Sequence, residues 1–421
     1  MALRKPIFGV LLAVGALLAV VPAAGATFPG ANGKIVFSGH ADNGPPYGSE
    51  GRDLFVVDPD GSNRVNLTHS ADFETGPDWS ADGTKLVYES TGGLWTMTAD
   101  GTAKRYLLLG ARATWAPSGT RIAYDRPEVF YPGTGKFEVY AVNTDGTGNT
   151  SLTKDFGGEV PSWSPRGDLI AFAHAPTGIH TMNTDGSNIR PVSQPNAFSP
   201  AFSPDGSQIL YACCGYPTQY DLWLVNADGT GEHRLTNTPE IEESAVFSPD
   251  GKHILFQRPG GPVRDEVWIM NADGSGARVL IEDAETPSWQ AIPNEPPDCS
   301  AASADPSIFT KHDGRMRVVR VSGVVDPDGD GLDLKVTGVT QDEPVTGRGD
   351  KTRPDARLIA GVLKVRAERS PRGDGRVYRI SFTARDPHGA ACSGLVTVAV
   401  PRNKHRPAID SAPPSYDSLP R

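Results

Sequence analysis

Short apolar runs recur at a regular interval over the first two thirds of the chain, and each run ends at a polar turn. The turn is Asp-Gly, and its Asp residues lie 40 to 45 residues apart. Glycine tolerates the positive φ of a tight turn, so Asp-Gly between two apolar runs predicts a β-hairpin. The six copies are Asp60-Gly61, Asp100-Gly101, Asp145-Gly146, Asp185-Gly186, Asp228-Gly229 and Asp273-Gly274. This period is typical of a four-stranded propeller blade.

A second motif alternates with the first and completes each repeat. An aromatic residue is followed by a turn and then by a new apolar run, as in Trp163-Ser-Pro-Arg-Gly167 and Phe202-Ser-Pro-Asp-Gly206. The two ends of the repeat array are complementary. Residues 32–37 begin a repeat that lacks its first strand, and residues 286–289 supply a first strand with no further repeat after it. The pattern predicts an all-β fold with a six-bladed β-propeller over residues 27–292, in which the last strand closes the first blade.

The pattern changes after Pro293. Residues 293–298 are rich in Pro and polar residues and predict a linker. Residues 299–400 hold five strand-like runs with alternating polarity and predict a small β-sandwich. The tail, residues 401–421, is rich in Pro and Ser and is predicted to be disordered.

The N-terminus has the three parts of an export signal. Arg4 and Lys5 precede an apolar run over residues 7–21, and Ala24-Gly25-Ala26 provides small residues for cleavage after Ala26. The apolar run is shorter than the roughly 20 residues that cross a bilayer, which argues against an anchor. The mature protein is expected to be secreted or periplasmic, in the cell envelope, and without a membrane anchor after cleavage.

Charge and composition narrow the function classes. Only 21% of residues are charged while Gly and Pro number 47 and 37, which excludes a coiled coil and favours many short strands and turns. Residues 27–293 carry 18 Lys and Arg against 33 Asp and Glu. An acidic body of this kind repels a phosphate backbone, so the sequence argues against nucleic-acid binding.

The four cysteines suit an oxidising compartment. Cys299 and Cys392 bracket the C-terminal region and are the natural disulfide pair. Cys213 and Cys214 are adjacent, and the sequence leaves open either a vicinal disulfide or two small buried residues.

The two repeated motifs resemble those of the TolB-type, WD40-like (PD40) propeller family, and the resemblance covers about residues 32–292. TolB proteins carry an α/β domain ahead of the propeller, whereas the repeats here follow the export signal directly. The resemblance therefore implies the propeller fold and not a role in the Tol–Pal system. Motifs within residues 298–400 resemble bacterial immunoglobulin-like or cadherin-like modules.

A partial calcium motif occurs in the C-terminal region. Asp326, Asp328 and Asp330 alternate along a turn with Gly331 at the sixth position, which suits an oxygen-ligated cation. Position twelve is Thr337 rather than Glu, so an acidic β-turn is the competing interpretation. Calcium is the one cofactor that the sequence suggests.

Variation in loop length points to a binding face. The long connections, at 38–53, 69–76, 125–138, 212–221, 237–243 and 257–266, fall on one side of the predicted propeller, here named the long-loop face. Aromatic residues beside carboxylates suit a protein or peptide partner with a basic patch. The candidate partner-binding residues are Tyr47, Phe130, Tyr131, Tyr216, Tyr220, Glu240 and Glu242.

The sequence contains no Gly-x-Ser-x-Gly elbow, no Walker A loop and no His-Glu-x-x-His helix, which are common catalytic motifs. The expected function is therefore that of an exported, monomeric, non-enzymatic binding protein of the cell envelope. Two alternatives stay open. One is a calcium-dependent surface adhesion protein, and the other is a propeller enzyme, a lyase or hydrolase, that acts on extracellular polysaccharide.

Overall fold

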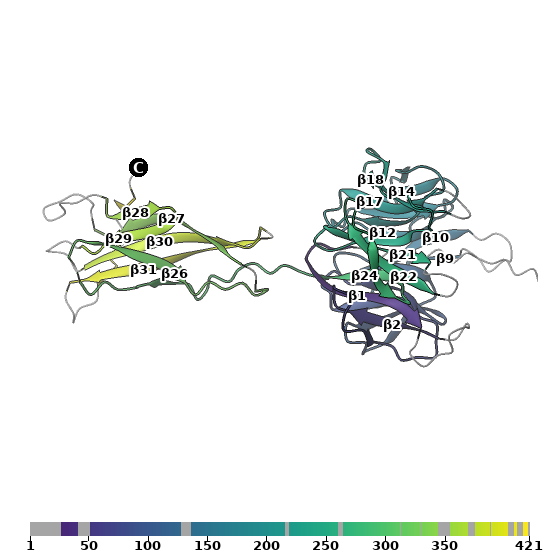
Figure 1. Ribbon diagram of the computed structural model, residues 1–421, viewed down its shortest axis with the longest axis horizontal. Coiled ribbons are helices and arrows are strands. Elements are labelled where there is room, and N and C mark those ends of the chain that lie inside the picture. Colours follow the sequence, from purple (N-terminus) through teal and green to yellow (C-terminus); the bar gives the residue numbers. More distant parts are fainter. Residues whose placement is uncertain are drawn as a thin grey trace, which may run out of the picture. The chain divides into compact units, whose positions relative to one another are not determined.

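The computed structural model divides into two compact units, Met1–Pro293 and Asn294–Arg421. It describes residues 27–40, 51–127, 136–214, 219–259, 264–311, 313–329, 331–343, 354–368, 375–387, 389–402, 408–410 and 416–419. These residues form strands and turns, with no helix among them, as Figure 1 shows. The predicted export signal lies outside them. The part of the chain that the structure describes accordingly has no apolar helix of membrane-spanning length.

The first unit consists of four-stranded antiparallel sheets, and one of them joins its two ends. That sheet has the order β24-β1-β2-β3 and contains β1 (Ala31–His40), β2 (Arg52–Val57), β3 (Val65–Asn66) and β24 (Glu285–Ile292). Strand β24 pairs with β1, with Trp289 opposite Ile35. The predicted closure of the first sheet by the last strand is thus confirmed.

Five further sheets in this unit each take four successive strands. Their strands are β4 (Thr75–Trp79), β5 (Lys85–Ser90), β6 (Gly93–Thr98) and β7 (Arg105–Leu108); β8 (Ala111–Trp115), β9 (Arg121–Pro127), β10 (Phe137–Asn143) and β11 (Thr150–Ser151); β12 (Glu159–Trp163), β13 (Leu169–His174), β14 (Gly178–Asn183) and β15 (Arg190–Pro191); β16 (Phe198–Phe202), β17 (Gln208–Cys213), β18 (Asp221–Asn226) and β19 (His233–Arg234); β20 (Glu243–Phe247), β21 (His253–Pro259), β22 (Asp265–Asn271) and β23 (Arg278–Glu282).

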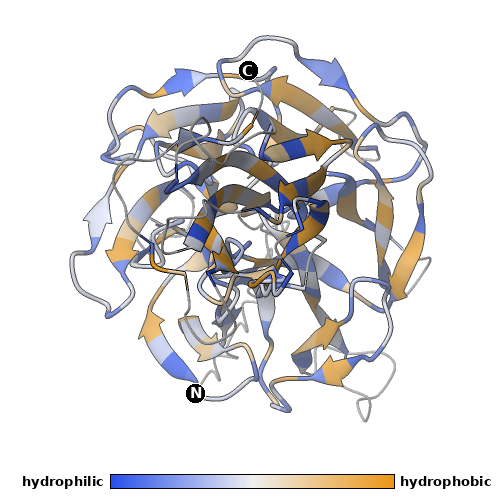
Figure 2. Ribbon diagram, turned by 90° about the vertical axis from the view of Figure 1, so that its left-hand side faces the viewer, coloured by the Kyte–Doolittle hydropathy of each residue, from blue (hydrophilic) through white to orange (hydrophobic). Residues whose placement is uncertain are grey.

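The sheets stand around a common centre (Figure 2). The first strand of each sheet contacts the first strand of the next, in the closed sequence β4, β8, β12, β16, β20, β24 and back to β4. The fifth residue of each inner strand is a buried aromatic residue, which packs between sheets; these residues are Trp79, Trp115, Trp163, Phe202, Phe247 and Trp289. The unit is a β-propeller.

The repeated turn residues hold neighbouring sheets together. Gly101 has a φ of +81°, and a Cβ there would lie 2.5 Å from the carbonyl oxygen of Leu67 in the preceding sheet. Glycine is therefore required both by the turn and by this close approach. The threonine after that leucine also bonds the backbone, since Thr68 Oγ1 accepts a hydrogen bond from the Leu54 amide at 2.9 Å.

The second unit contains two four-stranded sheets that share one apolar core. The first sheet has the order β25-β26-β29-β28 and the second β31-β30-β27-β32. Their strands are β25 (Ser303–Asp305), β26 (Met316–Ser322), β27 (Asp333–Gln341), β28 (Ala356–Ile359), β29 (Val362–Arg366), β30 (Gly375–Arg385), β31 (Ala391–Pro401) and β32 (Tyr416–Asp417). The predicted disulfide between Cys299 and Cys392 is present.

One prediction about the edges of this unit needs correction. The tail is not disordered throughout, because β32 pairs with β27 and the buried Ser418 donates a hydrogen bond to Gln341. The predicted linker also contributes contacts, since the Asn294 side-chain amide donates to Asp386. Both segments are short of apolar residues, and sequence composition does not register such polar pairings.

The closing strand should carry much of the stability of the propeller. Trp289 is buried, and its Nε1 donates to the Gly33 carbonyl at 3.0 Å. We expect Trp289→Ala to lower the free energy of unfolding by about 3–5 kcal/mol. All seven tryptophans lie in this unit, so urea unfolding followed by their fluorescence reports on it alone.

Ile292→Ala serves as the matched control, because Ile292 is on the same strand and 44% exposed. It should change the free energy of unfolding by less than about 1 kcal/mol. Equal losses in the two variants would contradict the closing role of β24.

Candidate functional site

The long-loop face lies at one edge of the propeller sheets. Because the strands alternate in direction, the ends of the second strands, the starts of the third strands and the starts of the inner strands meet there. Four of the predicted partner-binding residues, Tyr47, Phe130, Tyr131 and Tyr216, lie outside the described residues. Tyr220 is partly buried and packs edge-on against Phe198 with ring centroids 4.8 Å apart, and Glu240 is exposed.

The prediction that Glu242 faces a partner is wrong. Its side chain is fully buried and forms an ion pair with Arg258, whose Nε lies 3.0 Å from Oε1. Thr238 Oγ1 also donates to Glu242 at 3.0 Å. The carboxylate is enclosed because Arg258, on β21, reaches back over the connection that carries Glu242. The Glu242 carboxylate thus links two neighbouring sheets and is not accessible to a partner.

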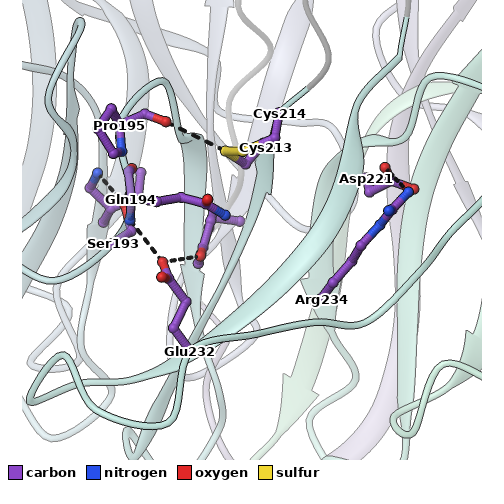
Figure 3. The surroundings of a disulfide bond; sticks show 10 residues. Ser193, Gln194, Pro195, Cys213, Cys214, Asp221, Glu232 and Arg234 are labelled. Atoms are coloured by element: carbon purple, nitrogen blue, oxygen red, sulfur yellow. Dashed lines mark hydrogen bonds and ion pairs between the residues drawn. A yellow bond between two sulfur atoms is a disulfide. The ribbon is translucent and has the colours of Figure 1, made fainter.

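Cys213 and Cys214 form a vicinal disulfide at the end of β17, on the same face (Figure 3). The Sγ of Cys213 lies 3.6 Å from the Pro195 carbonyl oxygen. The structure thus supports the disulfide interpretation over that of two separate thiols.

The calcium motif is only partly described. Asp326 Oδ1 accepts a hydrogen bond from the Asp328 amide, and Asp328 Oδ2 accepts one from the Glu295 amide, while Asp330 lies outside the described residues. Within the described ranges, no group of three or more His, Cys, Asp or Glu side chains is placed to hold a metal ion. Calcium binding by this loop stays a prediction.

A recurring β-bulge shapes the inner strands at the long-loop face. The second residue of each inner strand has a positive φ, between +48° and +57°, and the register shifts there. These residues are Gly76, Arg112, Val160, Ser199, Ser244 and Thr286. A bulge turns a backbone amide out of the ladder and leaves it to find another acceptor.

Side chains from the preceding sheet supply that acceptor at four of the bulges, including Gly76, whose amide donates to Thr286 Oγ1 on β24. The Arg112 amide donates to Glu89, the Val160 amide to Asp125 and the Thr286 amide to Gln257. Glu89, Asp125 and Gln257 occupy equivalent positions near the ends of β5, β9 and β21. These residues were not predicted from the sequence, although their common position in the repeat is a signal that could have found them.

Arg112 is the centre of a charge cluster on this face. Its Nη2 donates to Asp125 Oδ1 at 3.1 Å, its Nε lies 2.8 Å from Asp125 Oδ2, and its Nη1 lies 3.1 Å from Glu159 Oε2. The guanidinium also stacks over the Phe137 ring at 4.6 Å from its centroid. One guanidinium therefore pairs with two carboxyl groups, and the Arg112 backbone amide donates to a third, that of Glu89.

Burial raises the proton affinity of several of these carboxyl groups. Burial raises the pKa of Glu89 to about 7 and that of Asp125 to about 6, and the Arg112 charge only partly offsets it. On the other side of the ring, burial and the nearby Asp265 raise the pKa of Glu243 to about 7. Glu89 and Glu243 therefore retain protons near neutral pH because burial disfavours their charged forms.

The same chemistry recurs around the face. Arg52, Arg112 and Arg258 each bond a carboxylate, and each stacks on an aromatic ring. The carboxylates that surround them, here named the acidic edge, are Glu89, Asp125, Glu159, Glu242, Glu243, Asp265, Asp283 and Glu285. Even with Arg264 and His40 bound to Asp283, the acidic edge carries a surplus of negative charge.

Comparison with known proteins agrees with the fold. No family model matches the chain. An uncharacterized protein of Agrobacterium fabrum is 30% identical over 135 residues, which cover 28% of this chain and 46% of that protein. The Tol-Pal system protein TolB of Anaeromyxobacter dehalogenans is 32% identical over 118 residues, 27% of each chain. The chain thus spans less than half the length of these curated relatives.

Among solved structures, TolB from Acinetobacter baumannii superposes with a TM-score of 0.52 at 20% identity, over 62% of this chain and 67% of that one. At this identity the likeness concerns the fold alone. The described sheets and this superposition agree on one propeller architecture.

The raised pKa of Glu89 has a consequence for stability. The folded state favours the protonated form of Glu89. The contribution of this group to the free energy of unfolding is therefore largest below about pH 4.5 and is lost as the pH rises through about 7. We expect Glu89→Gln, which keeps an acceptor for the Arg112 amide, to be more stable than the parent by about 2–3 kcal/mol at pH 8. At pH 5 the two proteins should be nearly equal.

Urea unfolding followed by tryptophan fluorescence at both pH values measures this difference. Glu240→Gln, at an exposed position, should stay within about 0.5 kcal/mol of the parent throughout. A Glu89→Gln protein with the same pH dependence as the parent would show that this carboxyl group does not titrate as described.

Proposed function

We propose that this chain, whose first unit is a TolB-type β-propeller, is an exported, non-enzymatic binding protein that holds a basic protein or peptide in the cell envelope through its long-loop face. The acidic edge is the observation that carries this proposal. Its carboxylates outnumber its arginines, and several of them have a raised pKa. A cationic partner would supply the missing positive charge and release the retained protons.

The rigidity of this face supports binding. The bulge amides and the arginines hold Glu89, Asp125 and Glu242 in place at or beside strand ends. A surface whose charges are already positioned loses little conformational entropy when a partner docks. Its negative potential would also speed the encounter with a basic partner.

The edge carboxylates have a structural task that argues against catalysis by the same groups. Glu89 and Asp125 accept backbone amides from the next sheet, and Glu242 is enclosed by Arg258. An acid or base that exchanges protons with a substrate must reach it within hydrogen-bond distance. These carboxyl groups are directed toward the propeller itself, which favours an electrostatic role.

Binding of a labelled peptide of alternating Arg and Gly, followed by fluorescence anisotropy, tests the proposal. The full chain should bind this peptide, and a Glu-Gly peptide of equal length should not bind. Affinity should fall as salt is raised, because screening weakens contacts between exposed charges. The double variant Glu159→Gln, Glu243→Gln should bind at least about tenfold more weakly, a loss of about 1.4 kcal/mol.

The control removes the same charge from the opposite face. Asp228→Asn and Asp273→Asn change two exposed turn residues, and asparagine still accepts the Thr230 and Ser275 amides there. This control should bind like the parent. Equal loss in the two double variants would mean that only net charge matters, and the long-loop face would lose its role.

A further inference from the structure

A small pocket opens on the long-loop face between the sheets of β10 and β12. It has a volume of about 110 Å³, and the residues that decide its chemistry are Lys136, Phe137, Gly157, Gly158, Glu159 and His174. An engineered cavity of roughly 150 Å³ accommodates one benzene molecule, so this pocket has room for a single side chain and not for an oligosaccharide.

Glycine keeps the pocket open. Gly158 has a φ of +146°, and a Cβ there would lie 2.5 Å from the Phe172 ring. Gly157 has a φ of +92°, and a Cβ there would lie 3.1 Å from the Lys136 side chain. Larger residues at these positions would strain the backbone and crowd the walls, so the local sequence preserves this space.

The pocket is lined by one carboxylate, that of Glu159, and by the rings of Phe137 and His174. Glu159 lies beside the pocket and is bonded to Arg112, and Phe137 carries Arg112 over its ring. The two nitrogens of His174 are already bonded, Nδ1 to Thr177 Oγ1 at 2.7 Å and Nε2 to the Phe156 carbonyl at 3.1 Å. His174 therefore presents a ring surface and no unused donor.

The charge next to the pocket is unbalanced. The Arg112 guanidinium pairs with both Asp125 and Glu159, and no other cation is bonded to Glu159 in the part of the chain that the structure describes. A second cation beside Glu159 would relieve this imbalance. A guanidinium suits the place better than an ammonium, because it pairs with a carboxylate through two N–H groups and stacks on rings. Arg52, Arg112 and Arg258 all show that combination within this chain.

We propose that this pocket takes one arginine side chain of the partner, with its guanidinium paired to Glu159 and its stem against Phe137. This proposal rests on the proposed function, since it names the residue by which the basic partner is anchored. With such a pocket, binding to the long-loop face would depend on the sequence of the partner as well as on its charge.

The positive charge of Lys136 distinguishes a cationic ligand of the pocket from an anionic one. Its Nζ donates to the Asp155 carbonyl oxygen and lines the pocket. An arginine ligand is repelled by this ammonium, whereas a ligand with a carboxylate would be attracted to it. Removal of the charge should therefore strengthen the binding of an arginine and weaken the binding of an anion.

The experiment uses the full chain and blocked seven-residue peptides of Gly and Ser with a central Arg, citrulline or Glu, measured by isothermal titration. The Arg peptide should bind, while the citrulline peptide, which has the same shape without the charge, and the Glu peptide should bind at least tenfold more weakly. Lys136→Gln should tighten the Arg peptide by about two- to fivefold, as expected for one exposed charge. Glu159→Gln should weaken it at least tenfold.

Asp228→Asn is the control, because Asp228 is an exposed turn residue on the opposite face, outside the acidic edge, and asparagine still accepts the Thr230 amide. It should leave the Arg peptide unaffected, and circular dichroism confirms that each variant is folded. Weaker binding in Lys136→Gln, or equal losses in Glu159→Gln and Asp228→Asn, overturns the proposal. If the alternating Arg-Gly peptide binds the face but the single-Arg peptide does not, the pocket proposal fails and the proposed function stands. If neither binds, both fail.

Discussion

The pairing of β24 with β1 is the constraint on which the propeller depends. It places residues from the two ends of the repeat array in one sheet, with Trp289 opposite Ile35, and brings β24 against β4. Each inner strand then contacts the inner strands of the sheets on both sides, and the first sheet gains an inner strand from the far end of the repeat array. Burial of Trp289 and its bond to Gly33 hold this junction, so the ring closes through apolar contact as well as through backbone pairing.

Closure of the ring also determines the chemistry of the long-loop face. Inner strands that converge on a common centre bulge at the same position, and at Gly76, Arg112, Val160 and Thr286 the bulged amide donates to a side chain of the preceding sheet. Glu89 and Asp125 accept two of these amides, and Arg112 then bonds Asp125 and Glu159. The acidic edge thus contains carboxylates that accept hydrogen bonds from backbone amides. The proposed recognition of a basic partner would use charge that the fold already requires.

Much of the fold could be predicted from the sequence because its signals are local. The Asp-Gly turns and the aromatic strand ends lie within a few residues of the structures that they specify. The bonding of Glu242 to Arg258, and of Glu89 to Arg112 at the next sheet, depends on pairing between segments 16 and 23 residues apart, and the predicted exposure of Glu242 failed for that reason. The short strand at Tyr416 was missed likewise, since its partner is β27, far away in the sequence.

Hydrogen–deuterium exchange of the full chain, with and without the alternating Arg-Gly peptide, would show whether a basic peptide binds at the long-loop face, because it locates the contact without any substitution. We expect the peptide to slow exchange at the strand ends of this face, in residues 86–93, 109–113, 157–160 and 241–246. The Asp-Gly turns at the opposite edge and the second unit should be unchanged. Protection at those turns or within residues 294–421, or no protection at all, would contradict it.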